Sequence, residues 1–520
     1  MRILEISFLI LTLAVLIWSL KRNGVKSRVF SILWGCAFLA LMLHFIIEGW
    51  RWQMVPGYGV GAVILIVLLV RKFRERDADD QPRKWFRTAL KILLSGAGIL
   101  LVLISGILAW FFPVFKLPAP TGPYKVGTSQ WFLMDKSRKE TLTVEPDDYR
   151  EISVRSWYPA DASDMTRTAE YLPNSKLIGK AAFASPKVSG MLGLTWFREA
   201  GAEFIFDYFR LIKTHAYPNA AVSKKQAPYP VLIFSHGFGA VAIQNTALME
   251  ELASHGYAVF SIGHTYESLV EIFPDGRQAF FSPPKNNTID AEFFKLTKEA
   301  SEIKVGDPAF VTLLHKLNKQ SISESISADR IYVWSADTRF VIDWLEKMNT
   351  EDAGSPFYRQ LDLNKLGVLG MSFGGATAGQ VTVEDRRVKA AINMDGWPYG
   401  DWIDHPPEIA FMFMNSEGSI ALLNGIKQKL NDYMMEKSNA IFYSITVMGS
   451  KHINFTDLSV WSPVLKHMGA FGTIDGEKML KIMNAYTVAF FDKHLKGIDS
   501  PLLNGPSPAF PEVILKARNR

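Results

Sequence analysis

Residues 367–377 read GVLGMSFGGAT, a short apolar run that ends in a serine flanked by glycines. The part from Gly370 to Gly374 fits the pattern G-x-S-x-G, in which a sharp turn between a strand and a helix exposes the serine hydroxyl. Glycines suit this turn because it brings neighbouring backbone too close for side chains. A plain turn of small residues can have the same letters, so the surrounding sequence has to distinguish a nucleophile from a turn.

Strand-like and helix-like segments alternate on both sides of this serine. Short apolar runs that end in Gly, Ser, Asp or Glu lie at 228–237, 257–263, 367–372, 388–396, 408–417 and 441–450. Helical patterns separate them, such as 335–349, where apolar residues recur at helical spacing. This alternation predicts an α/β fold with a mostly parallel sheet covered by helices. Ligands of such sheets bind at the carboxyl ends of the strands, where the serine lies.

The first 115 residues hold most of the excess hydrophobicity of the 520-residue chain. They contain four apolar runs close to the roughly 20 residues that a membrane-spanning helix needs, at about 3–20, 29–47, 52–70 and 89–115. A cleaved signal peptide is the alternative for the first run, but Glu5 lies inside it and no small-residue cleavage site follows. We therefore predict about four retained transmembrane helices.

A proline-rich segment after the fourth run marks a domain boundary. The predicted organisation is a transmembrane module over 1–117 and an α/β domain over 118–520. Two segments interrupt the alternating pattern of the second domain, at about 166–227 and 266–330. Each is interpreted either as an ordinary surface insertion or as a lid or wall over a binding site.

Basic residues in the loops predict the orientation in the membrane. The loop after the first run carries Lys21, Arg22, Lys26 and Arg28. The loop after the third run carries Arg71, Lys72, Arg74, Arg76, Arg83, Lys84 and Arg87. The loop after the second run offers only Arg51. Because cations gather on the cytoplasmic side, we expect an integral protein of the cell (inner) membrane with an extracytoplasmic α/β domain.

Charge and cysteine content exclude some classes of protein. The net charge of +6 comes from the loops between apolar runs and not from a basic face on the second domain, so no nucleic-acid partner is predicted. The single cysteine, Cys36, allows neither an intramolecular disulfide nor a thiolate zinc site.

A nucleophilic serine needs a base to accept its proton and an acid to orient that base. In α/β-hydrolases the acid and then the histidine follow the serine along the chain. The histidines after Ser372 are His405, His452, His467 and His494. His452 is the preferred base, because it lies in the small polar loop MGSKHINF directly after a strand-like run. His467 and His494 lie in segments interpreted as packing or surface positions.

Asp395 is the preferred acid, because it ends the strand-like run that follows the helix after the serine. Asp401, Asp404 and Glu417 remain alternatives. An oxyanion hole would need two backbone N–H donors, one from the residue after the serine and one from an earlier loop. Phe373 offers the first of these donors. The second is expected from Phe238 in FSHGFGA at 234–240, whose glycines would also suit a plain turn.

Together these segments resemble the platelet-activating factor acetylhydrolase family of plasma and intracellular type, α/β-hydrolases also called lipoprotein-associated phospholipases. The resemblance covers most of residues 118–500. It depends on GPYKVGT at 122–128, WYPA at 157–160, FSHGFGA at 234–240, LASHGY at 252–257, GMSFGGAT at 370–377, NMDGW at 393–397, MNSE at 414–417 and GSKHINFTD at 449–457.

The resemblance implies an α/β-hydrolase fold, a Ser372–Asp395–His452 triad and oxyanion donors at Phe238 and Phe373. It also implies hydrolysis of short or oxidised sn-2 acyl groups from phospholipids, with no cofactor and no metal ion such as calcium. The chain departs from the family pattern in its membrane helices and at Met371, where histidine is usual. That side chain is expected to point away from the serine.

Three functions stay open at this point. The first is a membrane-anchored serine esterase acting on phospholipids, whose partners would be the lipid substrate and the bilayer. The second is a broader carboxylesterase, lipase or polyester hydrolase, since the same triad cleaves any ester that fits. The third is a non-catalytic membrane protein with a degenerate hydrolase domain, which the complete set of triad residues disfavours.

Overall fold

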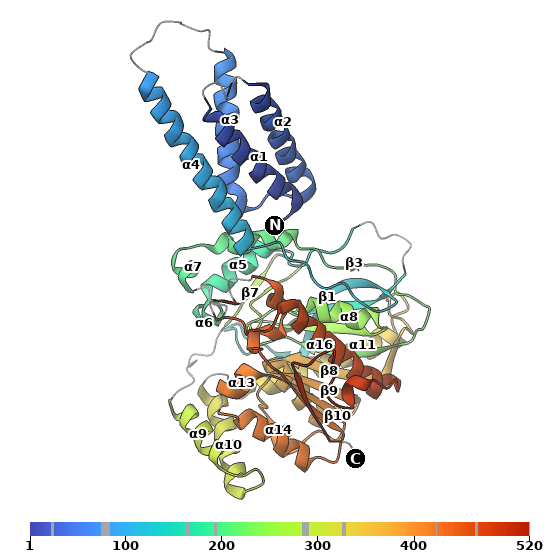
Figure 1. Ribbon diagram of the computed structural model, residues 1–520. Helices are drawn as coiled ribbons and strands as arrows, with labels where there is room; N and C mark the ends of the chain where they lie inside the picture. The colour runs from blue at the N-terminus through green and yellow to red at the C-terminus, as the bar shows by residue number, and fades with distance from the viewer. Residues whose placement is uncertain are drawn as a thin grey trace.

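The computed structural model describes residues 1–21, 25, 27–73, 84–161, 167–191, 195–282, 291–324, 329–422, 424–462, 466–467 and 469–518. Figure 1 shows a helical bundle at the N-terminal end, joined through its last helix to an α/β domain. The bundle consists of α1 (Ile3–Ser19), α2 (Arg28–Leu43) with its π-helical extension η2 (His44–Glu48), η3 (Trp52–Met54), α3 (Val55–Phe73) and α4 (Lys84–Phe111).

Three helical segments of the described chain are long and apolar enough to cross a membrane: Arg28–Glu48, Trp52–Val70 and Thr88–Phe111. Helix α1 is apolar too, but its 17 residues make it shorter than these three. The prediction of about four spanning helices is therefore supported for three of them. The three segments suggest that the protein associates with a membrane.

A buried ion pair fastens the bundle at the end nearest the α/β domain. The Arg51 guanidinium donates to both oxygens of Glu5, at 2.6 and 2.7 Å, and to the main-chain oxygen of Phe112 at 2.7 Å. It thereby joins the start of α1 to the end of α4. Of the basic loop residues that predict the orientation, five lie outside the described residues: Arg22, Lys26, Arg74, Arg76 and Arg83.

The α/β domain is built on a sheet of ten strands in the order β12-β11-β10-β9-β8-β4-β5-β2-β1-β3. The strands are β1 (Lys125–Lys139), β2 (Tyr149–Ala160), β3 (Ala216–Pro218), β4 (Tyr229–Ser235), β5 (Ala258–His264), β8 (Leu361–Met371), β9 (Val388–Met394), β10 (Ala410–Ser416), β11 (Phe442–Val447) and β12 (Val513–Arg518). The strands from β5 to β11 across the middle run parallel, and β2 and β12 flank them antiparallel. The predicted mostly parallel sheet is confirmed.

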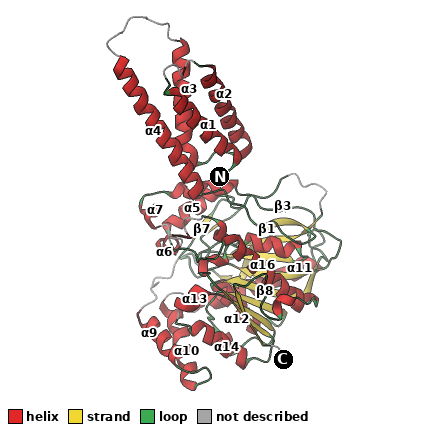
Figure 2. Ribbon diagram, viewed as in Figure 1, coloured by secondary structure: helices red, strands yellow, loops and turns green. Residues whose placement is uncertain are grey.

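Helices cover both faces of this sheet (Figure 2). Strand β4 sends Leu232 and Phe234 into a core with α8 (Thr246–Ser254) and α16 (Gly476–Phe491). It sends Val231 and Ile233 into a second core with α11 (Asp329–Thr350) and α14 (Ile426–Lys437). Since both faces are buried, central strands read as continuous apolar runs and not as alternating ones.

The two interrupting segments form structure of their own. Residues 166–227 contribute α5 (Ser175–Ala184), α6 (Pro186–Met191), α7 (Thr195–Glu199), η5 (Glu203–Leu211) and β3. Residues 266–330 contribute the hairpin of β6 (Val270–Ile272) and β7 (Gln278–Phe280), then α9 (Ala291–Glu302) and α10 (Pro308–Glu324). In Figure 1, α5–α7 lie between the bundle and the sheet, whereas α9 and α10 lie at the far end of the domain.

Candidate active site

Ser372 occupies the turn between β8 and α12 (Phe373–Glu384), with φ 56° and ψ −120°. An L-residue rarely adopts this conformation, and strained backbone of this kind clusters at functional sites. The flanking glycines are required sterically. A Cβ at Gly370 would lie 2.2 Å from the backbone of Gly374, and one at Gly374 would lie 2.0 Å from the Ser235 oxygen. The strand-turn-helix context predicted for the G-x-S-x-G stretch is confirmed.

His452 and Asp395 lie next to this serine. In the chain, His452 comes 80 residues after Ser372 and 57 residues after Asp395. The His452 Nε2 atom is 3.0 Å from the Ser372 Oγ, and its Nδ1 atom is 2.8 Å from Oδ2 of Asp395. Asp395 follows β9 directly, and His452 begins η7 (His452–Phe455), in the loop after β11. Parallel strands thus bring the three side chains together at one edge of the sheet.

Asp395 is buried and accepts further hydrogen bonds. Ser416 donates its N–H to Oδ1 at 3.0 Å and its hydroxyl to Oδ2 at 2.8 Å, and the Ser419 hydroxyl donates to Oδ2 at 2.6 Å. Burial alone would raise the pKa of Asp395. The Lys427 ammonium and the hydrogen bond from His452 outweigh burial and hold that pKa well below its ordinary value. Asp395 is therefore ionised and fixed in orientation.

Lys427 is the residue of this site that sequence reasoning missed. It lies at the start of α14 with only 3% of its surface exposed, and its Nζ donates to Asp395 Oδ1 at 2.5 Å. Burial lowers the pKa of Lys427 against the attraction of the carboxylate. Helical spacing is the sequence signal that could have identified Lys427 as buried, because Lys427 shares a helix face with the buried residues Leu430, Asn431 and Met434.

The other candidate acids have different partners. Asp401 accepts from the Tyr332 hydroxyl at 2.7 Å, and Asp404 pairs with His315 at 3.2 Å. Glu417 accepts from the backbone N–H of Gly449 at 2.7 Å.

The remaining candidate histidines lie in other surroundings. His405 follows η6 (Asp401–Ile403), and its backbone N–H donates to the oxygen of Asp401. His494 lies in η9 (Asp492–Lys496) against Phe490 and Tyr443.

Phe238 and Phe373, the predicted oxyanion donors, lie beside each other, with ring centroids 5.5 Å apart. Phe373 is the first residue of α12, a position whose N–H has no partner within the helix. Phe238 lies in the loop after β4. Its neighbours fix that loop: Gly237 donates its N–H to Gln244 Oε1 at 3.0 Å, and Gly239 donates to the Glu267 oxygen at 2.8 Å.

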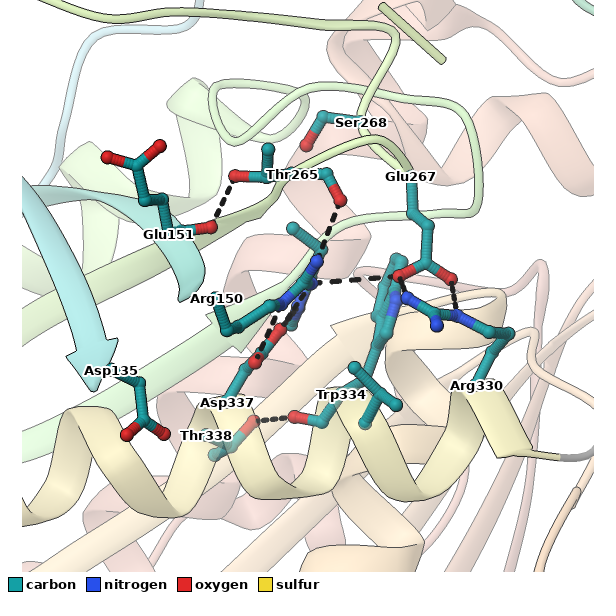
Figure 3. A network of polar contacts seen from close by, with 12 residues as sticks. Asp135, Arg150, Glu151, Thr265, Glu267, Ser268, Arg330, Trp334, Asp337 and Thr338 are labelled. Carbon is teal, nitrogen blue, oxygen red and sulfur yellow. Dashed lines mark hydrogen bonds and ion pairs between the residues drawn. The ribbon is translucent and has the colours of Figure 1, made fainter. Parts of the chain in front are cut away.

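A buried ionic network supports the loop of Glu267 from behind (Figure 3). Arg150 donates to both oxygens of Asp337, at 3.1 and 2.7 Å, and one of its nitrogens lies 3.6 Å from Glu267. Arg330 pairs with the same glutamate. Burial would raise the pKa of Asp337, but the Arg150 guanidinium and the His264 ring hold it well below its ordinary value. The network thus braces the loop that carries Phe238.

Two buried histidines lie beside this network but do not reach the serine. His236 shares a hydrogen bond with the Ser268 hydroxyl at 2.8 Å. His264 shares a hydrogen bond with Asp337 at 2.8 Å, and its ring stacks on that of Trp334 with the ring centroids 3.7 Å apart. Burial lowers the pKa of His236 to about 3 and that of His264 to about 4. Both rings are uncharged near neutral pH, which suits a positioning role.

A largely apolar cavity opens beside Ser372 and His452. Its other walls come from the loop after β4, from α5, from η5 and from η8 (Asp457–Val460). Met371 lines this cavity as well, with its sulfur 3.2 Å from the place of a Cβ on Gly237. It packs against the loop that carries Phe238 and forms part of the cavity wall. That its side chain points away from the serine stays a prediction.

The mostly parallel sheet and its covering helices fit an α/β-hydrolase fold, and the family and relatives of the chain show that it is an ester hydrolase. It matches the family model of platelet-activating factor acetylhydrolase, isoform II, over residues 109–310 and 350–500. The chain belongs to that family, as the sequence motifs predicted.

Curated relatives carry the same description. The chain is 25% identical over 391 residues to the platelet-activating factor acetylhydrolase of Gallus gallus, covering 73% of this chain and 84% of that protein. It is 26% identical over 384 residues to the Canis lupus familiaris enzyme of the same name, and the match covers 73% of this chain and 77% of that protein. A probable 1-alkyl-2-acetylglycerophosphocholine esterase of Arthroderma benhamiae is 23% identical over 449 residues, covering 80% and 98%.

Among solved structures, the chain resembles a ferulic acid esterase from Streptomyces cinnamoneus. The TM-score is 0.55 at 27% sequence identity, and the match covers 78% of this chain and 99% of that one. An ester hydrolase thus also stands among the structural neighbours.

Proposed function

We propose that this protein is a membrane-anchored serine esterase that hydrolyses short or oxidised sn-2 acyl esters of phospholipids. The observation that carries the proposal is the hydrogen-bonded series from Ser372 through His452 to Asp395, beside an apolar cavity. Family membership supports a lipid ester as the substrate.

The proposed reaction has two halves. In the first, His452 Nε2 accepts the proton of Ser372 as the serine Oγ attacks the ester carbonyl. The backbone N–H groups of Phe238 and Phe373 stabilise the resulting oxyanion. His452 then gives its proton to the departing lysophospholipid oxygen, which leaves an acyl-serine. In the second half a water molecule gives a proton to His452 as its oxygen attacks that ester, and His452 returns the proton to Ser372 Oγ as the carboxylic acid leaves. Asp395 orients the imidazole throughout.

The size of the cavity supports a short acyl group. Its volume is about 130 Å³, while an apolar cavity of about 150 Å³ admits one benzene molecule. A few methylenes fill such a space, whereas the long chain of an ordinary phospholipid exceeds it.

The proposed location is the cell (inner) membrane, with the hydrolase domain on the extracytoplasmic side. The basic loops predicted to be cytoplasmic join α1 to α2 and α3 to α4. In Figure 1 the N-terminus and the end of α4 lie at the opposite end of the bundle, next to the α/β domain. If those loops face the cytoplasm, the hydrolase domain lies outside.

A broader carboxylesterase is the second candidate, favoured by the likeness to a ferulic acid esterase. The two differ in the substrates they prefer. Rates of hydrolysis of 2-acetyl and 2-oxidised-acyl phosphatidylcholines, compared with p-nitrophenyl esters and feruloyl esters, separate them. The proposed function predicts the highest kcat/KM on the phospholipids, and the Ser372→Ala variant serves as the blank. A preference for non-lipid esters would favour the second candidate.

A further inference from the structure

The membrane bundle contacts the wall of the acyl cavity. That wall includes Phe206 and Phe209 of η5, which line the cavity together with Ser372. Trp461 packs against both rings from behind: it stacks on Phe206 at 5.3 Å and meets Phe209 edge-on at 5.4 Å. Trp461 is fully buried, and its Nε1 donates to the Tyr208 hydroxyl at 2.6 Å. One aromatic side chain therefore fixes the position of two cavity residues.

The end of α4 holds Trp461 in turn. The ring of Phe112, which follows the last residue of α4, lies 6.4 Å from that of Trp461. The hydroxyl of Ser462 donates to the Phe111 oxygen at 2.6 Å. Phe112 is buried in the same apolar cluster as Phe206 and Trp461. The contact between the bundle and the cavity wall therefore belongs to a packed core.

The segment that precedes α3, formed by Trp50 and η3, contacts the same wall from a second side. The Trp52 ring lies 5.7 Å from that of Phe112 and 5.1 Å from that of Phe204, and its Nε1 donates to the Ile205 oxygen at 3.4 Å. Arg210 donates to the Trp50 oxygen at 3.0 Å. Both ends of η5 are thus fastened to the bundle, and its middle faces the cavity.

We propose that the end of the membrane bundle is a specificity-determining part of the active site: Phe112, acting through Trp461, sets the depth of the acyl cavity. This inference rests on the proposed ester hydrolysis at Ser372. Close-packed interiors transmit a change of volume to their neighbours. Removal of the Phe112 ring lets Trp461 move into the vacated space. Phe206 and Phe209, which pack against Trp461, can then move back from the cavity, and the cavity becomes deeper.

Full-length protein in nanodiscs tests this inference with a series of p-nitrophenyl esters from acetate to octanoate. Since one methylene in an apolar pocket changes kcat/KM by about tenfold or more, Phe112→Ala should raise the octanoate-to-acetate ratio by about tenfold. Trp110→Ala is the matched control, because Trp110 is 56% exposed on the outside of the same helix end. It should keep the parental ratio.

Covalent labelling of each variant by a fluorophosphonate reports whether the catalytic site is intact. A labelled Phe112→Ala protein with the parental ratio overturns the inference. If that variant is not labelled, Phe112→Leu decides instead: a raised ratio supports the inference, and the parental ratio overturns it. A parent protein that cleaves none of the esters would instead defeat the proposed function, so the two failures are distinguishable.

Discussion

Replacing Lys427 by methionine removes the buried ammonium from Asp395 and keeps a side chain of similar length. Removing one partner of a buried ion pair costs about 3–5 kcal/mol of stability, because it leaves an uncompensated buried charge. Asp395 retains its hydrogen bonds from Ser416, Ser419 and His452. We therefore expect a loss near the lower limit, about 3 kcal/mol at neutral pH.

The loss should depend on pH in a defined direction. The pKa of Asp395 is depressed in the folded parent, so its ionisation contributes stability above the ordinary value of 3.8. That contribution disappears as the pH falls through the depressed folded pKa. Without Lys427 the largest cause that opposes burial is removed, and the pKa of Asp395 rises from its depressed value. The difference in unfolding free energy between parent and variant therefore has its full size at pH 7. It becomes smaller as the pH falls below the raised pKa of Asp395 in the variant.

Thermal unfolding of the full-length protein in detergent, followed by tryptophan fluorescence between pH 4 and 8, measures this difference. Lys389→Met on β9 is the control, because Lys389 is exposed and its Nζ donates to the nearby main-chain oxygen of Arg386. The control should unfold like the parent. Equal unfolding temperatures for Lys427→Met and the parent, or a gap that stays the same at pH 4 and 7, would refute this reasoning.

Three further predictions concern the site and the membrane orientation. His452→Gln should lower kcat by about 10⁴-fold with little change in KM. In His467→Gln and His494→Gln, kcat should stay within a few-fold of the parental value. The reverse pattern in steady-state kinetics would reject His452 as the base. Asp395→Asn should lower kcat by a similar factor, because an amide favours the wrong imidazole tautomer, and near-normal turnover would exclude Asp395 as the orienting acid. In bacteria, a C-terminal alkaline phosphatase fusion should be active and a C-terminal GFP fusion dark, whereas the opposite result would place the domain in the cytoplasm.

The sequence predicted the parts of this molecule that depend on local pattern. The turn at Ser372 requires glycines at fixed positions, and the buried central strands require continuous apolar runs. Both features can therefore be recognised in the sequence. The positions of Asp395 and His452 follow from the same logic, because each lies in the segment that follows a parallel strand of the sheet.

Contacts between distant segments were not predictable in this way. The Lys427–Asp395 pair joins a helix to a strand end 32 residues earlier, and the Arg150–Asp337 pair spans 187 residues. In a sequence such charges look like ordinary surface residues. Trp461 is another case, since its role depends on the place where α4 ends. The first apolar run was predicted over about 3–20 and forms α1 over Ile3–Ser19, but its 17 residues leave it shorter than the other three helices.

The central claim is that Ser372 is the nucleophile, and covalent labelling of the full-length protein by a fluorophosphonate tests it most directly. The account predicts that the parent is labelled on Ser372. It also predicts that Ser372→Ala takes up no label while its unfolding temperature stays at the parental value. Labelling of Ser372→Ala at the parental rate would contradict the account and assign the nucleophile to another residue.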